Sequence, residues 1–269
     1  MSDGADPAGP ADPPRPSDDD PAVLAAGSGD VELAILSMSA RSPDGEDAAY
    51  LEWHVLDHLP EQYRIDGVRH GQRWISTAAC RDARVASEAP FDEVDHIVNY
   101  LFAPPSHATM AETLDVFFTL GNSLHHGGRM PLRLPRKHLA IYDLVAKSAS
   151  SRALVGADVM PWRPARGVYV IVERTGGPVE VAPGHALDGL VDIDGVAGLW
   201  SYRGAAGRHR RVDDADGLEV TICYLDRDPV AVAETVGDHL VTHWAEGSIT
   251  PLLGAPFEIV EPWRWEHQL

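Results

Sequence analysis

The chain has 269 residues, of which 44% are apolar, and this proportion is ordinary for a globular protein with a hydrophobic core. Its formal net charge of −19 argues against nucleic-acid binding and against anionic membrane surfaces, because both partners select a basic face. Two cysteines, Cys80 and Cys223, are too few for a disulfide framework. With no signal-peptide pattern and no apolar run of membrane-spanning length, we expect a cytoplasmic protein.

Residues 1–29 are predicted to be a disordered, acidic, Pro-rich tail. They contain almost no large apolar side chain, so ordering them would bury too little surface to offset the lost chain entropy.

The first half of the chain, residues 30–150, alternates strand-like and helix-like patterns. Pro60 is expected to end or kink its first helix, because proline has no N–H and clashes with the preceding turn. A polar, Ala-rich insertion at 77–93 interrupts the pattern. The expected order is strand 31–40, helix 48–59, strand 68–76, strand 95–102, helix 109–124 and strand 139–145.

The second half, residues 160–269, repeats this order. We expect strand 167–173, helix 181–190, strand 195–203, strand 218–225, helix 230–245 and strand 257–263.

A repeated tetrapeptide supports two diverged copies of one unit. Ile65-Asp66-Gly67-Val68 recurs as Ile193-Asp194-Gly195-Val196 at the same place in each half, with glycine as the turn residue. Tyr100-Leu101 and Ala111-Glu112-Thr113 align in the same order with Tyr224-Leu225 and Ala233-Glu234-Thr235.

The predicted fold class is therefore α+β, with two tandem ferredoxin-like β-α-β-β-α-β units. Such a unit covers one face of its antiparallel sheet with helices, so the other face needs a partner. We expect the two sheets to pack as an α/β barrel with an internal cavity, in a monomer with an internal pseudo-dimer or in a homodimer.

The stretch from Trp53 to Pro60 (Trp-His-Val-Leu-Asp-His-Leu-Pro), followed by Ile65-Asp66-Gly67-Val68 and a strand with Arg and Trp, resembles the dimeric α/β-barrel superfamily. It is most similar to the EthD-like and antibiotic-biosynthesis-monooxygenase branches, over most of residues 31–265. In the second copy His185 stands near the place of His58, and no Leu-Pro follows.

Members of this superfamily include cofactor-free monooxygenases and cyclases of polyketide-type aromatics, lactone isomerases and haem binders. The resemblance thus implies a small-molecule cavity more directly than it implies a reaction.

His54 and His58 are the candidate catalytic residues. Their i, i+4 spacing places them one above the other on a helix, with His58 in the apolar stripe through Leu51 and Val55. A half-buried histidine can act as general acid or base because its pKa lies near neutrality. The same spacing suits a metal, but no Glu follows the first His as in HExxH helices. A structural, hydrogen-bonded histidine pair is the third alternative.

Five further residues are candidates for substrate binding. By strand alternation His70 and Trp74 share one face of their strand and Arg73 the other, whereas His96 and Tyr100 share a face of the next strand. Polar groups beside Trp74 would suit an aromatic ligand. The alternatives are a solvent-facing polar edge and, for Tyr100, a packing role.

Other polar groups have weaker signals. His125-His126 is interpreted as a helix C-terminal cap. A haem ligand is conceivable at His126, His185 or His243, without a motif for any of them. The basic cluster at 208–211 is interpreted as a solvated loop beside Asp213, Asp214 and Asp216, with anion binding as the alternative. No motif supports nucleotide binding, phosphoryl transfer or α/β-hydrolase chemistry.

The functional hypothesis is an enzyme without a metal or other cofactor. It would use His58 or His54 for acid–base isomerisation, cyclisation or cofactor-free oxygenation of a small aromatic or polyketide-like molecule. The alternatives are a haem protein of the same fold and a non-catalytic binding or scaffold protein whose interior is filled by side chains.

Overall fold

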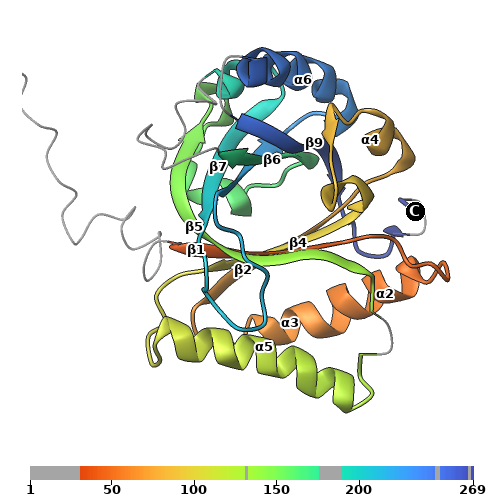
Figure 1. Ribbon diagram of the computed structural model, residues 1–269, viewed down its shortest axis with the longest axis vertical. Coiled ribbons are helices and arrows are strands. Elements are labelled where there is room, and N and C mark those ends of the chain that lie inside the picture. Colours follow the sequence, from red (N-terminus) through yellow and green to blue (C-terminus); the bar gives the residue numbers. More distant parts are fainter. Residues whose placement is uncertain (1–30, 131–132, 176–188, 246–248, 266–267) are drawn as a thin grey trace, which may run out of the picture. The chain divides into compact units, whose positions relative to one another are not determined.

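Nine strands form one antiparallel sheet in the computed structural model of the protein, and helices cover its outer side (Figure 1). The structure describes residues 31–130, 133–175, 189–245, 249–265 and 268–269. The strands are β1 (Leu33–Ser39), β2 (Val68–Ile75), β3 (Ala86–Ser87), β4 (His96–Phe102), β5 (Arg136–Ala149), β6 (Gly167–Thr175), β7 (Val196–Gly204), β8 (Leu218–Leu225) and β9 (Ile249–Ile259).

Five α-helices are found in the described part of the chain: α2 (Asp47–Trp53), α3 (Leu59–Gln62), α4 (Ala78–Asp82), α5 (Met110–His126) and α6 (Pro229–Ala245). A π-helical segment η1 (His54–His58) joins α2 to α3. Short 3-10 segments are η2 (Phe91–Glu93), η3 (Ser151–Ala153), η4 (Ala157–Trp162) and η6 (Leu190–Asp192). None of the described helices has the length and apolar character needed to cross a membrane.

Two long strands connect the halves of the sheet. The order is β2-β4-β1-β5-β7-β8-β6-β9-β3. The early residues of β5 pair with β1 and its later residues with β7. Likewise β9 pairs with β6 along most of its length and with β2 at its end, where Ile259 lies opposite Trp74. The pairing of β9 with β2 joins the two ends of the row from β2 to β9.

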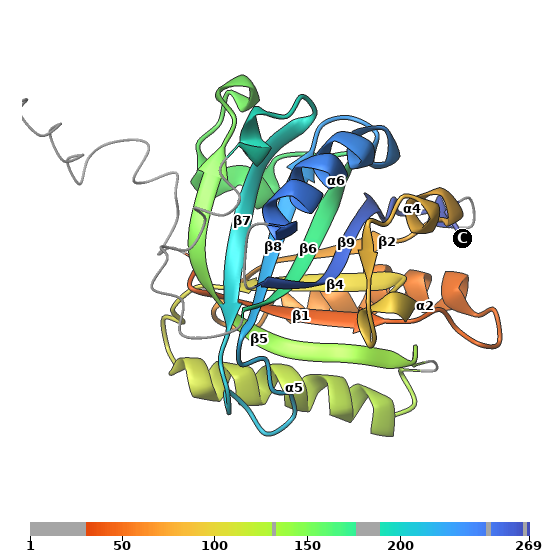
Figure 2. The same cartoon turned by 45° about the horizontal axis from the view of Figure 1, so that its top comes forward.

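Successive residues of each strand point to opposite faces of the sheet, one facing a core cluster and the other facing the helices. In β1, Ala34, Leu36 and Met38 belong to a core cluster that includes residues from both halves of the sheet. Its large members include Trp74, Trp200 and Phe257. The other face of the sheet carries the helices. In both views α2, α3 and α5 lie along β1 and β4 (Figures 1 and 2).

Both copies of the repeated tetrapeptide form the same turn. Gly67 and Gly195 have φ of +93° and +98°, in the left-handed region that favours glycine. In each copy the valine N–H donates to the isoleucine carbonyl at 3.1 Å. The glycine carbonyl then accepts from Ala103 N–H at 2.9 Å in the first half and from Asp226 N–H at 3.0 Å in the second.

The pairing of the strands corrects one pair of residues in the expected alignment of the two halves, Tyr100 with Tyr224. Val68 pairs with Phe102 and Val196 with Leu225, and a bulge follows in each strand. Phe102 therefore corresponds to Leu225, and the alignment of Tyr100 with Tyr224 is wrong by one residue. Accordingly Tyr100 packs on the helix side of the sheet, whereas Tyr224 belongs to the opposite core cluster.

Most predicted elements are present with shifted ends. The expected strand 218–225 coincides with β8, but the last strand was placed too late, at 257–263, whereas β9 begins at Ile249. Pro251 and Pro256 mask its start in the sequence, because proline is normally poor in strands. Both prolines nevertheless stand in register with β6, opposite Glu173 and Tyr169. The predicted tail 1–29 and most of the predicted helix 181–190 lie outside the described residues.

The turn glycines provide a stability test. A Cβ on Gly195 would lie 2.6 Å from Val232 Cγ2, and the backbone would hold an L-residue at positive φ. We expect Gly195→Ala to lower the free energy of unfolding by about 1–3 kcal/mol in chemical denaturation. Gly156→Ala is the matched control, because φ is −69° there and nothing lies within 4 Å of the added Cβ. Equal stability of the two variants would contradict the role of this turn.

Candidate functional site

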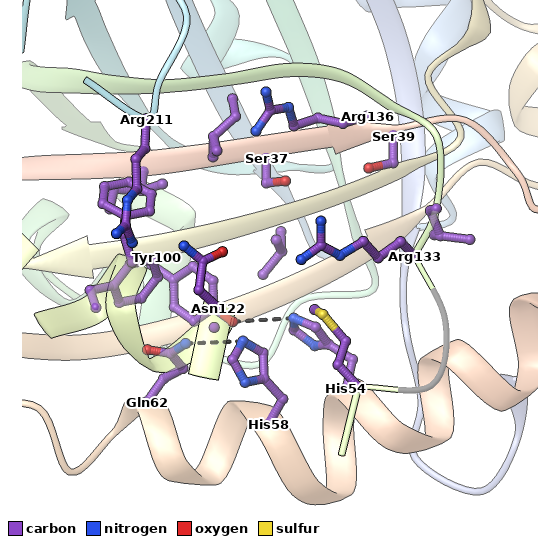
Figure 3. A pocket seen from close by; sticks show the side chains of 18 of the residues that line it. Ser37, Ser39, His54, His58, Gln62, Tyr100, Asn122, Arg133, Arg136 and Arg211 are labelled. Atoms are coloured by element: carbon purple, nitrogen blue, oxygen red, sulfur yellow. Dashed lines mark hydrogen bonds between the residues drawn. The ribbon is translucent and has the colours of Figure 1, made fainter. Parts of the chain in front are cut away.

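A pocket of about 400 Å³ lies between the first helical run, α5 and the helix-facing side of β1 (Figure 3). Its volume is within the range of roughly 300–1,000 Å³ that holds small molecules. Its lining combines aromatic and aliphatic walls with polar groups: Ile35, Ser37, Ser39, Tyr50, His54, His58, Gln62, Val98, Tyr100, Phe117, Phe118, Gly121, Asn122, Met130, Arg133, Leu134, Arg136, Leu139 and Arg211.

The helical run does not end at Pro60. It continues to Gln62, and the turn before the proline widens into a π-helix in which the Leu59 N–H donates to the His54 carbonyl, five residues back. A proline at this position would clash with a regular α-helical turn, and the wider turn is a common way to accommodate such a residue. Because His54 and His58 are the first and last residues of this turn, it sets the direction of both side chains.

His54 is buried between aromatic rings and bonded to the sheet. Its Nε2 lies 3.2 Å from the Tyr100 hydroxyl, and its ring neighbours Tyr50, Trp53 and His58. Its Nδ1 is buried and has no hydrogen-bond partner among the described residues. A buried nitrogen without a partner is uncommon in folded proteins, which makes His54 a candidate for a functional role.

His58 is held in a similar way by residues of its own helix. Its Nε2 lies 3.0 Å from Gln62 Nε2, and its ring stacks on Trp53 with centroids 5.0 Å apart. Its Nδ1 is also buried without a partner within the described structure. The centroids of the two imidazoles are 5.4 Å apart, so the expected arrangement of one histidine above the other is confirmed.

Burial keeps both imidazoles neutral at pH 7. It lowers the pKa of His54 well below its ordinary value, with help from the charge of Arg73. Burial likewise lowers the pKa of His58 to about 4, although Glu61 and Asp57 oppose the shift. The pKa of Tyr100 is raised by burial, so this phenol keeps its proton.

His96 and Arg73 lie behind the pocket rather than in its lining. His96 Nε2 is 2.7 Å from Asp47 Oδ1, and burial lowers the pKa of His96 to about 4 in spite of this carboxylate. The Arg73 guanidinium lies 4.7 Å from the centroid of the Tyr50 ring, which lines the pocket. Both residues thus act on the pocket through neighbours, electrostatically or by positioning.

The structure does not bring His70 or Trp74 to this pocket. Trp74 belongs to the core cluster on the opposite face of the sheet, and His70 packs against Trp162 at 5.6 Å. The pocket also lies elsewhere than expected. The large side chains of the core cluster occupy the side of the sheet where an internal cavity was expected, and the pocket lies on the helix side.

Sequence reasoning missed several lining residues. Gln62 follows His58 by four residues, so helical spacing could have identified it. Ser37 and Ser39 are the small polar residues on the helix side of β1. For Arg211 the interpretation as part of a solvated loop does not hold, because it lines the pocket, although it is far from the other lining residues in the sequence. The alternative for the cluster 208–211, anion binding, stays open.

The residues present do not match a metal or haem site. No group of three or more His, Cys, Asp or Glu side chains that could hold a metal occurs in the described part of the chain. Haem needs an axial ligand facing an apolar slot. His126 is exposed and its Nδ1 lies 2.8 Å from the Asn122 carbonyl, in agreement with the expected cap. His243 does not line the pocket, and His185 is outside the described residues. In the pocket, the Nε2 atoms of His54 and His58 already contact Tyr100 and Gln62, so neither is free to serve as an axial ligand through this atom.

Comparison with known proteins supports the fold. The sequence matches no family profile and no curated protein. A structure assigned as a chlorite dismutase shares 11% identity with a TM-score of 0.50, covering 88% of this chain and all of the other. An anthrone oxidase-like protein shares 11% identity with a TM-score of 0.45, covering 88% and 93%. A chlorite dismutase variant from Candidatus Nitrospira defluvii shares 10% with a TM-score of 0.47, covering 89% and 95%. The match with a TM-score of 0.50 supports the fold alone, an α+β architecture of the ferredoxin-like type.

The buried histidines predict a loss of stability in acid. An unfolded histidine takes up its proton near pH 6.5, but folded His58 and His96 do so only near pH 4. Between these values the unfolded state binds more protons, so the free energy of unfolding falls as the pH falls. Each histidine should account for about 3 kcal/mol between pH 7.5 and 4. His58→Gln should remove its share of this dependence in denaturation series; a pH dependence equal to that of the unsubstituted protein would contradict the assignment.

Proposed function

We propose that the protein is a small-molecule enzyme in which His58 and His54 move and hold protons on an aromatic or polyketide-like substrate. The observation that carries the proposal is the pair of buried, neutral imidazoles that line one pocket, each with an Nδ1 left without a partner among the described residues. Isomerisation, cyclisation and cofactor-free oxygenation all begin with removal of a proton, which a neutral imidazole can accept.

The hydrogen bonds suggest different roles for the two histidines. Tyr100 stays protonated, and its O–H donates a hydrogen bond to His54 Nε2. The proton of the neutral His54 ring is therefore on Nδ1, which can donate a hydrogen bond to a substrate oxygen. The Gln62 amide nitrogen faces His58 Nε2 as the side chain is placed; with the amide turned by 180°, its oxygen accepts a hydrogen bond from His58 Nε2–H. His58 Nδ1 then carries the lone pair that a general base needs.

The reaction can be written with these two groups. His58 Nδ1 takes a proton from a carbon beside a substrate carbonyl, and the electron pair of the broken C–H bond moves to the carbonyl oxygen. His54 Nδ1–H donates to the resulting enolate oxygen. Return of the proton at another carbon gives isomerisation, and attack on a second carbonyl gives cyclisation. Reaction of a methylene group with dioxygen gives a ketone and water.

We further propose that the halves 30–150 and 160–269 are tandem ferredoxin-like units that pack as one α/β barrel within a single chain. The two equal glycine turns and the corresponding roles of β5 and β9 support this. Because Ile75 lies opposite Glu258 in the β2–β9 pairing, the double variant Ile75→Cys, Glu258→Cys should form an intramolecular disulfide under oxidation. Failure of this disulfide to form in the folded protein would contradict closure of the barrel.

The catalytic proposal is tested with dithranol, an anthrone whose methylene group lies between aromatic rings and opposite its carbonyl. We expect the protein to accelerate deuterium exchange at this methylene and oxygen uptake with quinone formation. His58→Gln should lower both rates by about 10²–10⁴-fold, the usual contribution of a general base.

The controls separate chemistry from folding. His107→Gln changes an exposed histidine outside the pocket and should leave both rates unchanged. Tyr100→Phe removes the donor to His54 and should reduce the rates while exchange still depends on His58. Unchanged rates in a correctly folded His58→Gln protein would contradict the assignment of His58 as the general base.

A further inference from the structure

The pocket is positively charged, whereas the protein as a whole is acidic. The chain has 41 Asp and Glu residues against 22 Lys and Arg, yet the pocket lining contains three arginines and no carboxylate. Arg133 precedes β5, Arg136 is the first residue of β5, and Arg211 comes from the loop between β7 and β8. Figure 3 shows Arg133 and Arg211 reaching into the pocket from opposite sides. A chance distribution of charge in such a chain would favour acidic groups.

Arg211 is positioned by a fixed loop. The neighbouring His209 stacks on Phe118 of α5, with centroids 4.7 Å apart, and its Nε2 lies 3.1 Å from Asp115. Arg208 pairs with Asp143, and the Arg211 N–H donates to His209 Nδ1 at 3.2 Å. The loop is therefore held against α5 and β5, and the guanidinium of Arg211 is directed by these contacts.

The pocket arginines are poorly neutralised by the protein. Arg211 Nη1 is buried without a hydrogen-bond partner in the described structure. Arg136 lies 4.0 Å from Asp213, and both Arg133 and Arg136 are exposed. Behind Tyr50, the buried Arg73 also leaves Nε and Nη1 without partners there. A buried charged atom is normally paired, so an anion is a candidate partner for Arg211 Nη1.

We propose that the pocket binds a carboxylate-bearing aromatic molecule, with the carboxylate at Arg211 and Arg133 and the aromatic body against Phe117 and Phe118. This inference rests on the proposed function for the location of the substrate, and it adds the chemical class. Planar guanidinium groups match a carboxylate through paired N–H donors. The apolar walls and the histidines then lie around the rest of the molecule, where the proton transfer takes place.

The test compares three probes that share one aromatic body: naphthoate, neutral naphthylmethanol and naphthyl phosphate. Binding to the full chain is measured by titration calorimetry. Naphthoate should bind at least about tenfold more tightly than naphthylmethanol, because a charge-assisted hydrogen bond contributes about 1.5–3 kcal/mol. Equal affinities for naphthoate and the alcohol, or tighter binding of the phosphate than of naphthoate, would overturn the proposal.

Variants locate the anion. Arg211→Gln and Arg133→Gln should each weaken naphthoate binding about tenfold or more and change naphthylmethanol binding less than about twofold. Arg166→Gln makes the same charge change at an exposed arginine outside the pocket and should leave both affinities unchanged. If Arg211→Gln weakens acid and alcohol equally in a folded protein, Arg211 has only a structural role and the proposal fails.

The outcomes distinguish this inference from the proposed function. Charge-dependent binding through Arg211 with unchanged dithranol rates in His58→Gln would support the anion site and overturn the acid–base role. Loss of those rates in His58→Gln with no preference for naphthoate would support the acid–base role and overturn the anion site.

Discussion

Both faces of the sheet have to be removed from water, and the chain meets this constraint differently on each face. On one face, residues from both halves form a common core cluster that contains Trp74, Trp200 and Phe257. The pairing of β9 with β2 brings the last strand of the second half against the first half. Strand pairing and core packing thus depend on one another, and the other face is left to the helices.

On the helix-facing side of the sheet, apolar side chains fill the space beneath α6 in the second half, whereas the first half contains the pocket. β1 and β6 hold corresponding places, since Leu33 lies opposite Phe102 and Gly167 opposite Leu225. Counted from these positions, Ser37 of β1 corresponds to Ile171 of β6. Ile171 packs with residues of α6, whereas Ser37 is small and lines the pocket. Small side chains on β1 therefore leave the space that a ligand can occupy.

Polarity inside this space follows from burial. Aromatic neighbours desolvate His54 and His58, so both remain neutral at physiological pH, and each retains a buried nitrogen without a partner among the described residues. The arginines of the lining add fixed positive charges beside them. In the function that we propose, neutral imidazoles beside fixed positive charges would favour an anionic substrate and an enolate-like intermediate, so the proposed proton chemistry and the charge of the pocket agree.

The sequence by itself determined the order of most elements, the α+β class and the first helix as the element that carries His54 and His58, which line the pocket. Hydrophobic periodicity, the turn glycines Gly67 and Gly195 and the spacing of His54 and His58 are local properties, so they can be read along the chain. The limits of β9 could not be predicted, because its prolines are tolerated only through its pairing with β6.

Only the tertiary structure decided which residues meet. Strand alternation separates His70 and Trp74 from Arg73 and Tyr100, but it does not tell which face carries the helices. Arg211 reaches the pocket because the loop between β7 and β8 packs on α5, a contact between residues about a hundred positions apart. Such contacts are fixed by the packing of the whole sheet, and no local pattern encodes them.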